Sequence, residues 1–274
     1  MERVIPLEGG LNFRDLGGYE TRDGHRVRWR CLFRSGVMSR LTAADETRLR
    51  SFGIRAICDL RTRLERERET LRWAGEDVMR LEWDYDPRHL SLRSAASAPG
   101  FSATLAHSAM VEFYRALPTR FAPQYGALFA QLAAGTLPLV FGCSAGKDRT
   151  GMAAALILAS LGVSTKDVLL DFTLTNRVAD LERVLLARPH GSLGLGEEQS
   201  YLRALSPEVR APLLRAAPEY LEAAFDQISR DHGSLDGYLH DQLHVTDDSL
   251  YQMRAHLLLE DLTSTSEALG RTQS

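Results

Sequence analysis

One short stretch of the sequence brings together a thiol, two cations and three glycines. It runs Phe-Gly-Cys-Ser-Ala-Gly-Lys-Asp-Arg-Thr-Gly over residues 141–151. Cys143 and Arg149 stand there in Cys-x5-Arg spacing, so a nucleophilic sulfur and a guanidinium can face one bound group. The planar fork of donors in arginine suits two oxygens of a phosphate. The pattern therefore indicates chemistry on a phosphate, with the thiol as nucleophile.

A buried strand and a buried helix are expected to hold this stretch. Residues 137–141 form a short apolar run opened by Pro138, which is typical of a parallel strand buried on both faces. Residues 151–161 are apolar nearly all round and end at Gly162, which predicts a core helix. The stretch then lies at a helix N-terminus, where free N–H groups and the helix dipole favour an anion and a thiolate.

Other interpretations fit parts of the pattern. Cys-x5-Arg spacing arises easily by chance in an Arg-rich chain, and a small thiol before a helix is often core packing. A nucleotide-binding P-loop needs four residues between its glycines and Ser or Thr after its lysine. Gly142 and Gly146 have three residues between them, and Asp148 follows Lys147, so that P-loop is rejected.

Several segments of the chain together resemble one family. The Cys-Ser-Ala-Gly-Lys-Asp-Arg-Thr-Gly run is similar to the phosphate loop of the atypical bacterial and fungal tyrosine/serine phosphatases, which carries the Lys-Asp pair. The octet Asn-Phe-Arg-Asp-Leu-Gly-Gly-Tyr at 12–19 and the Arg-Ser-Gly at 34–36 resemble that family's opening signatures, in the same order. Asp-Leu-Arg-Thr at 59–62, followed by Glu65, and the run at 171–176 resemble further features of the family.

The resemblance implies an α/β fold of the protein-tyrosine-phosphatase type. Its central, largely parallel sheet would have helices on both faces and a helical lid insertion. We expect one phosphatase domain over residues 1–262, with the proline- and glycine-broken segment 177–216 as the lid. Residues 263–274 are expected to form a frayed tail.

The resemblance also implies a two-step phosphomonoester hydrolysis with no metal or cofactor. Cys143 attacks phosphorus, Arg149 and the loop N–H groups stabilise the charge, and water resolves the phosphocysteine. Asp148 is the preferred general acid, with Asp59 second and the carboxylates at 84 and 86 behind it. Thr150 would donate a hydrogen bond to the departing thiolate. The predicted substrate-binding residues are Ser144, Ala145, Gly146, Lys147 and Arg61.

Some of these residues also have plain structural interpretations. Asp148 can pair with Lys147 or a neighbouring Arg, and Asp59 can be a helix-start acid paired with a nearby Arg. The family has His immediately before the cysteine, whereas this chain has Gly142. Such a histidine helps to hold the loop and favours the thiolate. The alternative function is therefore a phosphate-binding pseudophosphatase. The signatures at 12–19 and 149–151 argue against a third possibility, a sulfur-transfer module of the rhodanese type.

The predicted substrate is a phosphorylated protein, phosphotyrosine first. Phosphoserine, phosphothreonine and a phospholipid headgroup stay open, because Lys147 resembles the extra cation that meets a second phosphate in phosphoinositide phosphatases. A net charge of −3 argues against nucleic-acid and anionic-membrane binding. The longest apolar run has about a dozen residues, fewer than the roughly 20 that span a bilayer. These features predict a cytoplasmic protein. They leave open export without a cleavable signal, and they leave open the oligomeric state.

Cysteine and histidine spacings favour neither disulfides nor metal. Cys31, Cys58 and Cys143 lie far apart and form no Cys-x-x-Cys pair. A protective disulfide between Cys58 and Cys143 on oxidation is conceivable, although a buried thiol is the favoured interpretation of Cys58. His240 and His244 have i,i+4 spacing, but Asp241 stands where a zinc-protease motif has Glu, which favours surface polarity.

Hydrophobic period and turn residues predict the remaining elements. The expected strands are 27–33, 54–59 and 78–83, and the expected helices are 43–52, 63–72, 110–117, 124–134, 166–174, 219–230 and 250–259. Residues 88–108 are predicted to be a loop.

Overall fold

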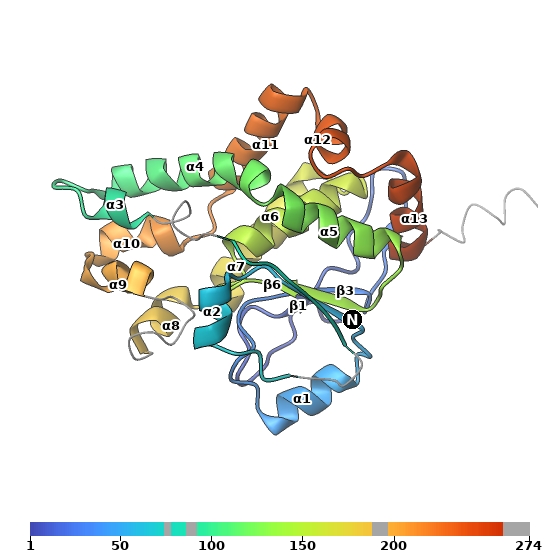
Figure 1. The fold of residues 1–274 in the computed structure, drawn as a ribbon, viewed down its shortest axis with the longest axis horizontal. Coiled ribbons are helices and arrows are strands. Elements are labelled where there is room, and N and C mark those ends of the chain that lie inside the picture. The colour runs from blue at the N-terminus through green and yellow to red at the C-terminus, as the bar shows by residue number, and fades with distance from the viewer. Residues whose placement is uncertain (74–77, 86–91, 188–196, 260–274) are drawn as a thin grey trace, which may run out of the picture.

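A mostly parallel β-sheet lies at the centre of the computed structural model (Figure 1). The structure describes residues 1–73, 78–85, 92–187 and 197–259. Strands β3, β6, β4 and β5 are parallel, and β1 pairs with β3 in the opposite direction. In sheet order the strands are β1 (Arg14–Asp15), β3 (Leu32–Ser35), β6 (Leu139–Gly142), β4 (Ala56–Asp59) and β5 (Met79–Glu82). The predicted fold class is confirmed.

The two faces of the sheet bury separate hydrophobic cores. Side chains alternate between the faces of a strand, so Leu139 and Phe141 of β6 join one core and Val140 joins the other. The larger core includes residues of helices α4, α5 and α6, while the smaller includes Leu49 of α1. Figure 1 shows the helices on both sides of the sheet. A parallel sheet covered in this way needs no polar residues along its central strand, as the 137–141 run predicted.

The helices account for most of the remaining chain. They are α1 (Ala43–Arg50), α2 (Arg63–Arg68), α3 (Arg93–Ala96), α4 (Ala103–Arg120), α5 (Ala122–Ala133), α6 (Asp148–Ser160), α7 (Thr165–Val178), α8 (Leu181–Ala187), α9 (Glu197–Ala204), α10 (Pro207–Leu214), α11 (Pro218–His232), α12 (Leu235–Asp241) and α13 (Asp247–Leu257). A small second sheet pairs β2 (Arg26–Val27) with β7 (Leu258–Leu259).

Two helices begin with capping boxes, in which a hydroxyl and a carboxylate satisfy the free N–H groups of the first turn. In α1 the pair is Thr42 and Asp45, as the sequence predicted. In α2 the pair is Thr62 and Glu65. The second box fixes the backbone that carries Glu65, and this carboxylate also reaches the phosphate loop, residues 143–149.

Several segments differ from the sequence prediction. The helix expected over 63–72 ends at Arg68, and the last two residues of the helix expected over 250–259 form β7 instead. The strand expected over 27–33 is divided into β2 and β3, because Arg30 adopts a positive φ of 63° that turns the chain. The loop expected over 88–108 contains α3 and the start of α4, which Ser102 caps. Alanine favours helices, so the Ser/Ala-rich composition that suggested a loop is compatible with them, and Pro99-Gly100 separates the two.

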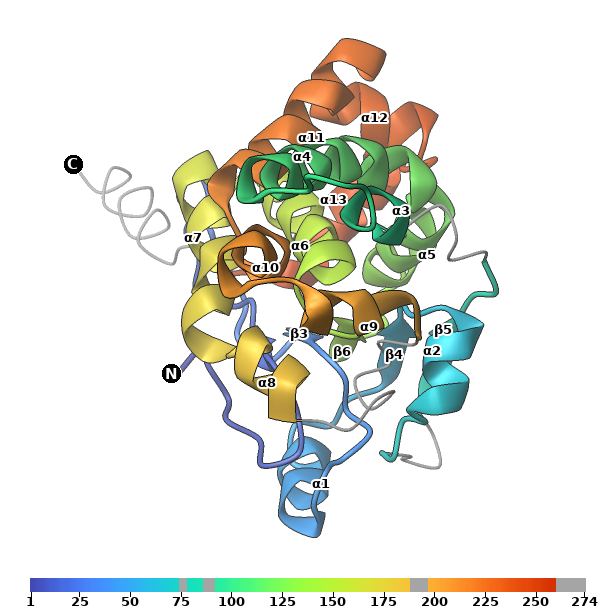
Figure 2. The ribbon, with the colours of Figure 1, turned by 90° about the vertical axis from the view of Figure 1, so that its left-hand side faces the viewer.

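The predicted lid segment contains α8, α9 and α10, which Figure 2 shows grouped in front of β3 and β6. Helix α7 continues to Val178, so the first two residues of the predicted 177–216 range belong to α7. The predicted tail at 263–274 lies outside the described residues. Among the helices that the structure describes, none is both long and apolar enough to cross a membrane.

Candidate active site

The phosphate loop connects the end of β6 to the start of α6. Helix α6 begins at Asp148, three residues before the predicted start, so the loop lies directly at a helix N-terminus. Gly146 has a positive φ of 66°, and a Cβ there would lie 2.6 Å from the backbone nitrogen of Gly36. Only glycine fits this backbone conformation and this close approach.

Hydrogen bonds hold the carbonyl groups of the loop. The N–H of Val37 donates to the carbonyl of Ser144 at 2.9 Å. The Asn12 amide donates to the carbonyl of Ala145 at 3.3 Å and to that of Gly146 at 2.8 Å. Arg34 Nη2 also donates to the Gly146 carbonyl, at 2.8 Å.

These bonds orient the N–H groups of the loop. In a planar trans peptide the C=O and N–H point in opposite directions. The N–H of residue 145 therefore points away from Val37, and the N–H groups of residues 146 and 147 point away from Asn12 and Arg34. Among the described residues, none accepts a hydrogen bond from them. A set of converging, unpaired N–H groups at a helix N-terminus is an anion site.

A buried ionic cluster supports the loop from behind. Asp171 of α7 accepts hydrogen bonds from Arg34 and, at 3.1 Å, from Arg14 Nε. Burial alone would raise the pKa of Asp171, but the charges of Arg14 and Arg34 outweigh it and lower the pKa to about 2. The segments 12–19, 34–36 and 171–176, which suggested the family, therefore meet behind the phosphate loop.

Arg149 is held by Glu65 of α2. Nη1 and Nη2 donate to the two carboxylate oxygens of Glu65, each at 2.7 Å. Nη1 also contacts the Leu60 carbonyl at 3.1 Å and the Tyr85 hydroxyl at 2.8 Å. Burial would raise the pKa of Glu65, but the Arg149 charge and hydrogen bonds from Arg149, Ser144 and the Thr62 N–H lower it to about 2.

This arrangement leaves one edge of the guanidinium for a ligand. Arginine has five N–H donors, and the contacts above use both on Nη1 and one on Nη2. The Nε–H and the second Nη2 hydrogen lie on the other edge and have no acceptor among the described residues. Two parallel donors in this spacing match two oxygens of a phosphate.

Cys143 follows Gly142 at the start of the loop and is 3% exposed. The Thr150 hydroxyl lies 3.5 Å from the Ser35 carbonyl oxygen, and the Thr150 side chain is buried. Gly142 pairs with Ser35 of β3, and a Cβ at Gly142 would lie 2.7 Å from the Ser35 carbonyl oxygen. The position that the family fills with His therefore has no room for a side chain unless β3 shifts.

Asp148 and Lys147 contact each other and two other helices. Asp148 Oδ1 lies 3.3 Å from Lys147 Nζ and accepts a hydrogen bond from the Tyr114 hydroxyl at 2.9 Å. Lys147 Nζ also donates to the carbonyl of Leu213 at 2.6 Å, and the Lys147 side chain is 2% exposed. The Lys147 ammonium thus binds the end of α10, whereas the sequence suggested that it would contact a second phosphate of the substrate.

Comparison of the sequence with known proteins identifies the family. The sequence pattern described as "Tyrosine phosphatase family" fits residues 5–259. This chain belongs to the tyrosine phosphatase family. A Cupriavidus necator protein provisionally named as a tyrosine-protein phosphatase is 35% identical over 254 residues, which cover 90% of this chain and 85% of the relative. The triple specificity protein phosphatase PtpB of Mycobacterium tuberculosis is 31% identical over 292 residues, covering 93% of this chain and 99% of PtpB. The predicted family and class of enzyme, protein-tyrosine phosphatase, are confirmed.

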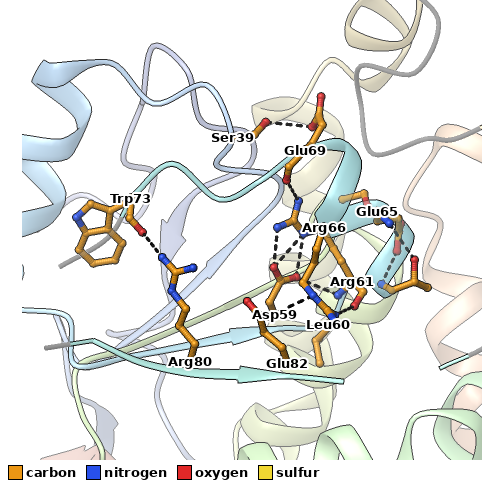
Figure 3. A network of polar contacts seen from close by, with 12 residues as sticks. Ser39, Asp59, Leu60, Arg61, Glu65, Arg66, Glu69, Trp73, Arg80 and Glu82 are labelled. Carbon is orange, nitrogen blue, oxygen red and sulfur yellow. Dashed lines mark hydrogen bonds and ion pairs between the residues drawn. The ribbon is translucent and has the colours of Figure 1, made fainter. Parts of the chain in front are cut away.

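Two residues predicted to act in this phosphatase contact each other. Arg61 Nη2 donates to Asp59 Oδ2 at 2.6 Å, and Arg61 Nε lies 2.9 Å from Oδ1 (Figure 3). Arg61 Nη1 donates to the Glu69 carbonyl at 2.7 Å. Both side chains are buried. These contacts favour the structural interpretation, a buried ion pair at the end of β4, over roles in acid catalysis and substrate binding.

The remaining candidates lie in varied settings. Asp84 accepts a hydrogen bond from Arg66 at 2.8 Å, while residue 86 lies outside the described residues. Cys58 is fully buried, and this burial raises the pKa of its thiol, which opposes formation of the reactive thiolate. Helix α12 ends at Asp241, so the histidines at 240 and 244 do not share a helix.

Several site residues were not among the sequence predictions. Glu65 carried a signal, because Thr62-x-x-Glu65 has the form of a capping box, but nothing in that motif indicates a partner 84 positions away. Tyr85 and Tyr114 carried none. Their contacts with Arg149 and Asp148 depend on how the segment after β5 and helix α4 pack against α6.

Proposed function

We propose that this enzyme hydrolyses phosphomonoesters on proteins, phosphotyrosine first, through a phosphocysteine at Cys143. The observation that carries the proposal is the set of unpaired donors on one loop: among the described residues, none accepts a hydrogen bond from the N–H groups of residues 145–147 or from the free edge of Arg149, and the buried thiol of Cys143 begins the same loop. Binding a tetrahedral dianion there places its phosphorus in reach of the sulfur.

The reaction has two steps. The Cys143 thiolate forms an S–P bond as the P–O bond to the substrate breaks, and Asp148 gives its proton to the leaving oxygen. Water then attacks phosphorus and gives a proton to the Asp148 carboxylate, which restores the acid, and the S–P electron pair returns to sulfur as phosphate departs. Arg149 and the loop N–H groups stabilise charge on the equatorial oxygens in both steps, and the Thr150 hydroxyl, close to the loop, donates to the departing thiolate.

The substrate range is proposed to extend beyond phosphotyrosine to phosphoserine and phosphothreonine. The name of the M. tuberculosis relative, a triple specificity phosphatase, supports testing all three. The contact of Lys147 with the Leu213 carbonyl removes the observation that favoured phosphoinositides, because this ammonium is already paired. Soluble phosphoinositides therefore serve as the comparison substrate.

We also propose that α8, α9 and α10 form a lid on a single phosphatase domain. Lys147 joins the phosphate loop to Leu213 at the end of α10. Tyr201 of α9 packs against the larger core, and burial first, then the negative charge of Asp148, raise its pKa to about 12. Substrate entry would then require the lid helices to move.

Aryl phosphate turnover tests the proposal, with Cys143→Ser as its control. The parent protein is expected to release phosphate, and Cys143→Ser is expected to release none while binding phosphate normally. Phosphate binding by the parent without turnover would instead indicate the pseudophosphatase alternative. Turnover that persists in Cys143→Ser would refute the role of the thiol.

A further inference from the structure

The hydroxyl of Tyr114 has one observed role. Tyr114 lies in the middle of α4 and is fully buried, and its hydroxyl donates to Asp148 Oδ1 at 2.9 Å. Buried tyrosine hydroxyls usually have a hydrogen-bond partner, and here that partner is the carboxylate proposed as the general acid.

Both direct contacts of Asp148 are made by the same oxygen. Tyr114 and Lys147 each approach Oδ1, at 2.9 Å and 3.3 Å. Within the described part of the chain, Oδ2 has no hydrogen-bond partner, and the Asp148 side chain is 25% exposed. A carboxyl group whose Oδ1 accepts two donors keeps its proton on Oδ2. That oxygen is then the one that can reach a leaving group.

We infer that Tyr114 is a positioning residue that fixes Asp148 through Oδ1 and stabilises the carboxylate that forms when its proton leaves. The inference rests on the proposed function, in which Asp148 protonates the leaving oxygen. Tyr114 donates while the P–O bond breaks and Asp148 becomes an anion, and it keeps its own proton throughout. Burial first, and the adjacent Asp148, raise the pKa of Tyr114 well above its ordinary value, so it remains a donor.

Other polar groups lie near Asp148, although the Tyr220 hydroxyl itself donates to the Pro212 carbonyl at 3.0 Å. Lys147 approaches from the loop, and Tyr201 of α9 and Tyr220 of α11 have pKa values of about 12, raised by burial and then by the charge of Asp148. The rings of Tyr220 and Tyr114 lie 5.4 Å apart. Of the three tyrosines Tyr114, Tyr201 and Tyr220, Tyr114 is the one with an observed hydrogen bond to the Asp148 carboxylate.

The test compares two aryl phosphates, one with a good and one with a poor leaving group. Tyr114→Phe should lower kcat/KM about tenfold for the poor leaving group, as expected for one lost hydrogen bond to a charged group, and much less for the good one. The basic limb of the kcat/KM profile should also move to higher pH, because the acid loses a donor that favours its ionised form.

A matched control is Tyr238 of α12, whose hydroxyl also contacts α4. Tyr238 is also fully buried, and its hydroxyl donates to the Pro118 carbonyl of α4 at 2.8 Å. Tyr238→Phe should cost similar stability and change neither the leaving-group dependence nor the pH profile. Should Tyr114→Phe fold poorly, 3-fluorotyrosine at position 114 keeps the shape and donates more strongly, so the basic limb should move to lower pH.

The outcomes separate this inference from the proposed function. The positioning role is overturned if Tyr114→Phe loses kcat/KM equally on both esters and its pH profile does not move, while Asp148→Asn still loses more kcat/KM on the ester with the poor leaving group. Asp148→Asn without such dependence would remove the acid itself. A variant that combines Tyr114→Phe with Asp148→Asn supports the inference if its loss of kcat/KM is no larger than that of Asp148→Asn alone. Fully additive losses of the two substitutions contradict it.

Discussion

The pair formed by Glu65 and Arg149 makes the stability of this phosphatase depend on pH. Both oxygens of Glu65 bind Arg149, and Ser144 donates to Oε1 at 2.6 Å. The pKa of Glu65 falls from its ordinary 4.5 to about 2, which corresponds to about 3 kcal/mol of preference for the ionised form. This contribution is present above pH 4.5 and is lost as the pH falls toward 2.

Glu65→Gln removes that contribution and places an amide donor against Arg149. The free energy of unfolding of the wild type should therefore exceed that of the variant by about 3 kcal/mol at pH 7. At pH 3 Glu65 of the unfolded chain is protonated while Glu65 of the folded protein is still mostly ionised, which should reduce the difference to about 1 kcal/mol. Urea unfolding of both proteins at the two pH values measures it. We also expect kcat/KM to fall, because Arg149 loses the partner that orients its free edge.

Glu67→Gln on the same helix is the matched control. Glu67 pairs with Arg63 at 2.8 Å across one turn, and the two side chains are 54% and 60% exposed. Exposed pairs of this kind contribute below about 0.5 kcal/mol, so this variant should unfold nearly as the wild type does. The reasoning is refuted if Glu65→Gln behaves like Glu67→Gln, or if its deficit is the same at pH 3 and pH 7.

Substitutions at two further positions, Gly142 and Lys147, test how the loop is held. A Cβ at position 142 would lie 2.7 Å from the Ser35 carbonyl oxygen, so Gly142→Ala should lower the free energy of unfolding by about 1–3 kcal/mol. For the same reason Gly142→His should not raise aryl phosphate turnover. Higher turnover in Gly142→His would show that this position limits catalysis. Lys147→Met keeps the buried stem but removes the donor to the Leu213 carbonyl. This variant should speed amide hydrogen exchange at the end of α10. It should also lower activity equally on a phosphotyrosine peptide and on a soluble phosphoinositide. A loss confined to the phosphoinositide would instead support Lys147 as a cation that binds a second phosphate.

The parts of the fold that could be predicted from sequence are those set by local patterns. The apolar run at 137–141 became β6 because both faces of the sheet are covered. Thr42 and Asp45 begin α1 by a capping box that is legible in four residues. The α3–α4 region was missed, because a Ser/Ala-rich segment is compatible with a loop and with a helix, and packing decides between them.

The site shows the same division. Cys143, Asp148 and Arg149 were identified because the loop that carries them is continuous in sequence. Glu65 and Tyr114 belong to α2 and α4, and their contacts with Arg149 and Asp148 arise from tertiary packing. The roles of Lys147 and Gly142 also depend on distant backbone, the Leu213 carbonyl and the Ser35 carbonyl.

The most direct test of the central claim is to trap the covalent intermediate. An aryl phosphate with a good leaving group is mixed with the enzyme, the reaction is quenched with acid within one turnover, and the peptides are analysed by mass spectrometry. The account predicts one added phosphoryl group on the peptide that contains Cys143, and none in Cys143→Ser. Turnover without phosphorylation of Cys143, or with the phosphoryl group on another residue, would contradict it.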